Sequence, residues 1–60
     1  MNKIQKLALA EKIASEQGRW AEFSRLYNSY RDEQKVMQSL ERALTDMGLL
    51  AEFKARVIHS

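Results

Sequence analysis

The chain contains no cysteine and no proline, and it has only two glycines and one histidine. The absence of cysteine excludes disulfides and thiolate metal sites, and a lone histidine leaves little for a metal ion. We therefore expect neither a metal nor a cofactor. Because proline is absent, nothing forces the chain out of helical conformation. Gly18 and Gly48 are then the two obvious places for helices to end.

The residue patterns of enzymes are also missing. Nucleophilic catalysis requires a Ser or Cys beside an oriented base, and the only candidate base of the histidine type is His59 at the end of the sequence. No glycine-rich loop is present to cradle a phosphate, and no cluster of His, Asp and Glu has metal-ligand spacing. We predict that the protein has no catalytic residues and is not an enzyme.

Long hydrophobic runs are absent as well. No apolar stretch approaches the ~20 residues that span a bilayer. The short apolar stretch over residues 7–10 does not reach the length of a signal-peptide core. We therefore expect a cytoplasmic protein with no membrane partner.

Half of the sixty residues are Ala, Leu, Glu, Lys or Arg, a composition typical of long helices and coiled coils. A chain of this length forms one domain, here the whole of residues 1–60, and buries only about 60% of its unfolded surface. Small domains of this kind are usually stabilised by disulfides, metals or a second subunit. With the first two excluded and 45% hydrophobic residues, we expect a homodimer.

The first helix is predicted over residues 3–17. Its apolar residues recur at spacings of three and four, and Asn2 is well placed to cap its first turn. Gly18 ends it, since glycine accepts the left-handed conformation that follows a helix. An alternative is one continuous helix with Gly18 inside it, at a cost of about 1 kcal/mol.

A long central helix is predicted over residues 20–47, which contain neither Gly nor Pro. The prediction depends on four apolar residues spaced seven apart: Phe23, Tyr30, Met37 and Leu44. We assign Met37 and Leu44 to the core or to a dimer seam. The weak point is the polar run over residues 31–35. Ser29 and Asp32 resemble a capping box, so a break near residues 28–32 is the alternative.

A short helix is predicted over residues 49–58, after a helix end at Gly48. Glu52 and Arg56 form an i,i+4 pair within it. The fold class is thus all-α: a long central helix flanked by two shorter ones, in a homodimeric helical bundle.

The segment from Gly18 to Phe23, together with Tyr27 and Tyr30, is similar to the inter-helix turn and second helix of a tetratricopeptide repeat. Phe23 and Tyr30 depart from that family, which has small residues there. The resemblance covers about a third of the chain, and no second copy is expected to follow. It implies a helix, a tight turn and an antiparallel helix.

Two further resemblances concern the overall format. The Asp32-Glu33-Gln34 segment, followed by Ser39-Leu40, is similar to the second helix of the Rop family of plasmid RNA-binding helical hairpins. That resemblance implies a dimeric four-helix bundle with a turn near residue 30. In size, charge and lack of cysteine, the chain also resembles small helical accessory proteins of temperate bacteriophages.

Two groups of residues are candidate binding sites. Arg19, Trp20 and Tyr27 belong to an aromatic cluster, and Trp, Tyr and Arg dominate the energetics of protein interfaces; the simpler interpretation of this stripe is core. Arg31, Lys35 and Arg42 follow helical spacing and would form a basic ridge facing RNA or DNA; the simpler interpretation is a solvated face. The net charge of +2 permits nucleic acid without requiring it.

The sequence therefore predicts a small regulatory protein that acts as a helical homodimer and binds an unidentified protein partner. A phage or plasmid accessory factor that modulates a host process fits this description. The alternative is a helical dimer that binds RNA or DNA through the basic ridge.

Overall fold

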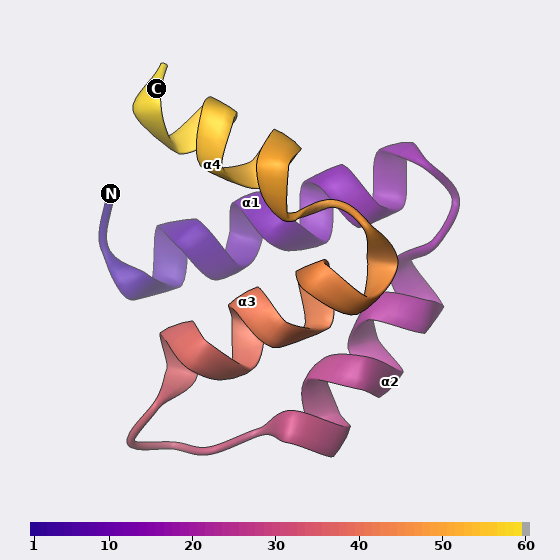
Figure 1. The fold of residues 1–60 in the computed structure, drawn as a ribbon, viewed down its shortest axis with the longest axis vertical. Coiled ribbons are helices and arrows are strands. Elements are labelled where there is room, and N and C mark those ends of the chain that lie inside the picture. The colour runs from indigo at the N-terminus through magenta and orange to yellow at the C-terminus, as the bar shows by residue number, and fades with distance from the viewer. Residues whose placement is uncertain (60) are drawn as a thin grey trace.

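A computed structural model describes residues 1–59, which form four helices and no strand (Figure 1). The helices, in chain order, are α1 (Lys3–Glu16), α2 (Trp20–Tyr30), α3 (Val36–Met47) and α4 (Leu50–Ile58). The predicted all-helical class is confirmed over this range. The predicted first and last helices are confirmed to within one residue at each end.

Two helices form the centre of the molecule and two lie at its sides. In Figure 1, α1 and α3 run side by side in the same direction, with α4 beside α1 and α2 crossing on the side of α3. Both α1 and α3 contact α2 and α4. The radius of gyration is 10.3 Å, close to the ~10 Å expected for a compact domain of this length. A single chain therefore closes around one core.

The core combines residues from all four helices, with the largest share from α3. Phe23, Ile13, Leu40 and Leu44 are the largest of its fully buried side chains. Spacings of three and four between buried positions on α3 give that helix one continuous apolar face. The buried hydrophobic residues are Ala10, Ile13, Ala14, Phe23, Leu40, Ala43, Leu44, Met47, Leu49 and Phe53.

The predicted long helix over residues 20–47 is wrong, because the chain leaves helical conformation over residues 31–35. The alternative prediction, a break near residues 28–32, agrees with the structure except that the observed break lies a few residues later. A straight helix of 28 residues would be ~42 Å long, whereas the longest dimension of the molecule is 28 Å. Folding α3 back against α1 and α2 buries its apolar face, which a straight helix leaves exposed.

Side-chain hydrogen bonds replace the helical ones in this turn. The Ser39 hydroxyl donates to the carbonyl oxygen of Tyr30 at 2.8 Å and accepts from the Asp32 N–H at 3.1 Å. The Gln34 N–H, which would bond to Tyr30 in a continuous helix, donates instead to the Asp32 carboxylate at 2.9 Å. Asp is well suited to such local bonds to its own backbone. The polar run thus forms a turn.

The remaining helix ends agree with the predictions. Asn2 and Gln5 form a reciprocal capping box at the start of α1, with bonds of 2.8 and 3.0 Å. Gly18 and Gly48 have φ angles of 66° and 73°, in the left-handed region. After each glycine the next N–H reaches five residues back, to Ala14 in one turn and to Leu44 in the other, at 2.8 Å. Both turns are therefore Schellman motifs.

The two glycine turns belong to two copies of one helix–turn–helix unit. Residues 18–23 and 48–53 both read Gly-x-x-Ala-Glu-Phe, at an offset of 30 residues. Burial repeats with the same offset, in the following pairs: Ala10 with Leu40, Ile13 with Ala43, Ala14 with Leu44, and Phe23 with Phe53. The expectation that no second copy follows the glycine turn is therefore wrong.

The two halves contact each other through corresponding pairs of helices. Exchanging the halves turns the contact between α2 and α3 into the contact between α4 and α1, and the structure contains both. Stacked repeats would place each unit only against its neighbour along an array. Here the second half closes back onto the first, which explains how two copies alone bury a core.

Candidate interaction surfaces

Trp20 is the most exposed aromatic residue of residues 1–59. Trp20 is the first residue of α2, directly after the glycine turn, and its side chain is 51% exposed. Phe23, one turn later, is buried. Within the part of the chain that the structure describes, the Trp20 indole makes no hydrogen bond. The predicted partner-binding tryptophan thus lies at the surface, outside the buried core.

Arg19 fixes the turn that presents this tryptophan. Its guanidinium donates two hydrogen bonds to the Glu22 carboxylate, at 2.9 and 2.8 Å, and a third to the Met47 carbonyl oxygen at 3.1 Å. The Arg19 guanidinium lowers the pKa of the Glu22 carboxyl. The bond to Met47 ties the start of α2 to the end of α3. Arg19 therefore holds Trp20 in place, while a direct role in partner binding stays a prediction.

Tyr27 lies two turns after Trp20 on α2, so the two side chains share a side of that helix. It is half-buried, and its ring stacks on Phe23 with centroids 5.9 Å apart and planes at 21°. Tyr27 covers the core residue Phe23 and keeps part of its surface in solvent. Of the three predicted partner-binding residues, only Trp20 is more than half exposed.

The predicted basic ridge is divided by the break in the helix. Arg31 lies in the turn, where its guanidinium is 3.7 Å from the Glu33 carboxylate. Lys35 and Arg42 remain together, since both line one polar hollow of about 260 Å³ on α3. The Arg42 guanidinium carbon is 4.5 Å from the centre of the Tyr30 ring. The full lining is Tyr30, Asp32, Lys35, Gln38, Ser39 and Arg42.

Tyr30, which lines this hollow, is contacted at both its hydroxyl and its ring. Its hydroxyl donates to the Asp46 carboxylate, and this bond raises the pKa of the phenol. Arg42 covers its ring. The aspartates at positions 32 and 46 reduce the positive field near Lys35 and Arg42. The hollow therefore presents two cations that are partly neutralised by the protein itself.

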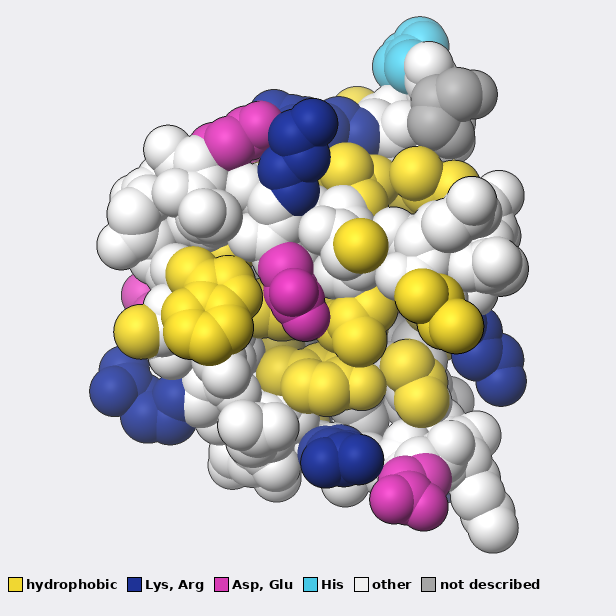
Figure 2. Space-filling model, turned by 180° about the vertical axis from the view of Figure 1, so that it is seen from behind, with side chains coloured by type: hydrophobic (Ala, Val, Ile, Leu, Met, Phe, Trp, Pro, Cys, Tyr) yellow, Lys and Arg dark blue, Asp and Glu magenta, His cyan; other side chains and the backbone are white. Residues whose placement is uncertain are grey.

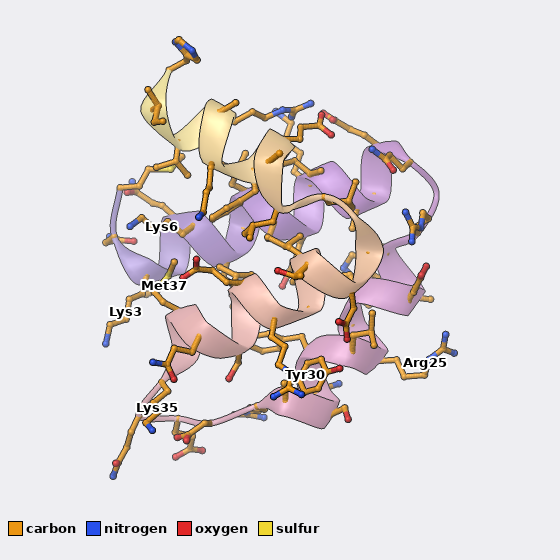
Figure 3. All side chains as sticks on the ribbon, in the orientation of Figure 1. Lys3, Lys6, Arg25, Tyr30, Lys35 and Met37 are labelled. Carbon is orange, nitrogen blue, oxygen red and sulfur yellow. The ribbon has the colours of Figure 1, made fainter. Side chains whose placement is uncertain are left out.

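An apolar groove between α3 and α4 was not predicted. It has a volume of about 260 Å³ and is lined by Lys6, Met37, Glu41, Phe53, Lys54, Val57 and Ile58. Figure 3 shows Lys6 and Met37 at the same edge of the molecule, from the first halves of α1 and α3. Assigning Met37 to the core or a dimer seam missed this role: it is half-buried and lines the groove.

Residues 1–59 contain neither a membrane-spanning helix nor a metal-binding cluster. No helix in this range is both long enough and apolar enough to cross a membrane. The same residues contain no group of three or more His, Cys, Asp or Glu side chains arranged to hold a metal ion. The described surface thus offers three features: the Trp20 region, the polar hollow and the apolar groove.

Comparison of the chain with protein families, with curated proteins and with solved structures found no match.

Proposed function

We propose that this chain is a small non-enzymatic interaction protein that binds a protein partner through the surface around Trp20. One observation carries the proposal: a tryptophan that is 51% exposed, on a helix start fixed by Arg19. Tryptophan contributes more than most residues to protein interfaces. Presenting it from a fixed turn reduces the ordering cost of binding. A regulatory role, as a phage or plasmid accessory factor that modulates a host process, is part of this proposal.

Self-association is the second part of the proposal. The structure closes its core within one chain, so an uncovered long helix no longer supports a dimer. The support comes instead from exposed apolar side chains, with Ile4 80% and Ile58 76% exposed. Figure 2 shows hydrophobic side chains gathered across the middle of one face, with most charged side chains at its margin. A patch of that kind commonly marks an interface.

Light scattering tests the oligomeric state. A homodimer should give about twice the 7.0 kDa chain mass, with a melting temperature that rises with protein concentration. A mass of one chain, with melting that does not depend on concentration, would exclude the dimer and leave the partner proposal intact.

Trp20→Ala tests the partner proposal, with Arg25→Ala as the control for loss of an exposed side chain on the same helix. Affinity capture from bacterial lysate, with nuclease present, should recover a discrete protein band with the wild-type and Arg25→Ala chains. Trp20→Ala should lose that band while circular dichroism keeps its helical signal, because Trp20 is outside the buried core. Unfolding of Trp20→Ala to the extent expected for a core truncation would show that the aromatic cluster is core.

Binding of RNA or DNA is the competing proposal. The observation in its favour is that Lys35, Arg42 and Gln38 line one hollow, which offers cations for phosphates and an amide for bases. Neutralising Arg31, Lys35 and Arg42 together should then abolish binding. The slope of log affinity against log salt should lose roughly 0.7–0.9 per lost contact. Lysate recovery that nuclease removes would favour this alternative.

A further inference from the structure

The two halves of the molecule differ at one aromatic position beside the buried phenylalanine. In the first half, Phe23 is followed four residues later by Tyr27, and the two rings stack. In the second half, Phe53 is followed four residues later by Val57. Because i and i+4 lie on the same side of a helix, Val57 occupies the position of Tyr27 without its ring. The missing ring coincides with the apolar groove, which Phe53 and Val57 both line.

The groove is therefore the place that Tyr27 fills in the other half. At the 30-residue offset, Met37 and Glu41 correspond to Leu7 and Glu11, so these parts of the two sites are alike. A cavity of about 150 Å³ lined by apolar side chains is enough to hold benzene. The groove, at about 260 Å³, has room for a complete aromatic side chain.

The same comparison shows a change in charge. Lys6 and Lys54 line the groove, whereas their counterparts at the 30-residue offset are Val36 and Ser24. Figure 3 places Lys3 at this edge of the molecule as well. Glu41 is the single acidic residue of the lining. Compared with the first half, the second half thus has no ring at this position and has two more cations around it.

We propose that this groove binds an aromatic side chain from an acidic segment of a partner protein. The incoming ring packs over Phe53 and Val57 as Tyr27 packs over Phe23, and the flanking carboxylates face Lys6 and Lys54. Met37 lines one wall, and its unbranched thioether adapts to rings of different shape. The groove is a different surface from the one around Trp20, so this proposal does not depend on the proposed partner site. It shares Ile58 with the exposed apolar side chains that support self-association.

The probe is the blocked peptide acetyl-Glu-Glu-Phe-Glu-Glu-amide, titrated into the intact chain and followed by NMR chemical shifts and calorimetry. We expect saturable binding with shifts centred on residues that line the groove. Replacing the peptide Phe by Ala removes the buried aromatic side chain and should weaken binding by at least about tenfold. Replacing its Glu residues by Lys should weaken it as well.

Val57→Tyr is the decisive variant, because it introduces the ring that the first half already carries. It should weaken peptide binding by at least about tenfold while thermal stability is kept. The double variant Lys6→Val with Lys54→Ser, which copies the charges of the first half, provides a second test that adds no bulk to the groove. It should weaken binding and reduce its dependence on salt. Trp20→Ala is the control and should bind the peptide as the wild type does.

Three outcomes would overturn the proposal. The first is no saturable binding at millimolar peptide. The second is binding that neither Val57→Tyr nor the double lysine variant weakens. The third is a wild-type dimer that Val57→Tyr converts to a monomer in light scattering, since the groove would then be occupied by a second copy of the chain.

Discussion

The hydroxyl of Ser39 donates a hydrogen bond to the carbonyl oxygen of Tyr30, nine residues earlier, at 2.8 Å. The Ser39 hydroxyl oxygen also accepts a hydrogen bond from the Asp32 N–H at 3.1 Å. Ser39 is 4% exposed and is the one buried polar residue of the described chain. One side chain on α3 thus satisfies two backbone groups where α2 ends.

Ser39→Ala should therefore destabilise the fold by about 1–3 kcal/mol, because it removes two hydrogen bonds to partly buried backbone groups. Ser29→Ala is the matched control, since Ser29 is exposed on α2 and Ala favours helix slightly. Urea denaturation of both variants would measure the difference. Equal stability of the two variants would contradict the role assigned to Ser39.

Gly18→Ala and Gly48→Ala should each lower the free energy of unfolding by about 1 kcal/mol or more, because both positions have positive φ. A Cβ at either site meets no atom within 4 Å, so the cost is conformational and not steric. In a domain of this size that corresponds to a fall of about 4–8 °C in melting temperature. Asn tolerates the left-handed region better, so Gly18→Asn should lose less. A rise in melting temperature on changing either glycine to Ala would contradict the observed turns.

Leu44→Ala and Met37→Ala should differ in how much stability they lose, although the two residues are seven apart in one predicted apolar stripe. Leu44 is completely buried, so its truncation should cost about 2–5 kcal/mol, enough to unfold a marginal domain. Met37 is half-buried at the groove, and its truncation should cost less than that. Thermal melting by circular dichroism distinguishes them. Similar losses would place Met37 in a seam that is buried in solution.

Acid should weaken the contact between α1 and α4. The Arg56 guanidinium donates to the Glu16 carboxylate at 2.7 Å and lowers the pKa of that carboxyl. The unfolded chain then binds this proton at higher pH than the folded chain. The contribution is present above the ordinary carboxyl pKa and is lost as the pH falls through the lowered value. Both groups are partly exposed, so the effect should also shrink with salt.

Glu16→Gln checks this pH dependence. Melting temperature measured from neutral to acidic pH should fall less steeply for Glu16→Gln than for the wild type. Arg56→Gln should flatten the same part of the curve, because it removes the other member of the pair. An acid limb that neither substitution changes would exclude a contribution from this contact.

The helix ends at Gly18 and Gly48 could be predicted because a single residue type carries the signal. The break over residues 31–35 could not be predicted with the same ease, because its hydrogen bonds depend on Ser39, which lies beyond the break. The seven-residue spacing of Phe23 and Leu44 continues across the turn, since each faces the same core from a different helix. Periodicity therefore reported the burial of Phe23 and Leu44 correctly and the continuity of the helix wrongly.

The candidate sites show a similar division. An exposed aromatic edge at Trp20 followed from its position at the start of a helix stripe. The role of Arg19 in fixing the turn could not be predicted, because its third hydrogen bond reaches Met47, 28 residues away. The groove was missed because it depends on comparing Val57 with Tyr27, and that comparison requires recognising the 30-residue offset. The motif Gly-x-x-Ala-Glu-Phe was the signal in the sequence that could have revealed it.

The contacts between the halves have a consequence for how two chains could pair. Because α2 packs on α3 and α4 packs on α1, the surfaces that join the halves within one molecule can also join halves from two molecules. The turn over residues 31–35 decides between these arrangements. If that turn became helical, α2 and α3 would form one continuous helix. The second half of the chain could then pack only against the first half of another chain. Domain swapping of this kind would build an intertwined dimer from the same contacts that close the monomer.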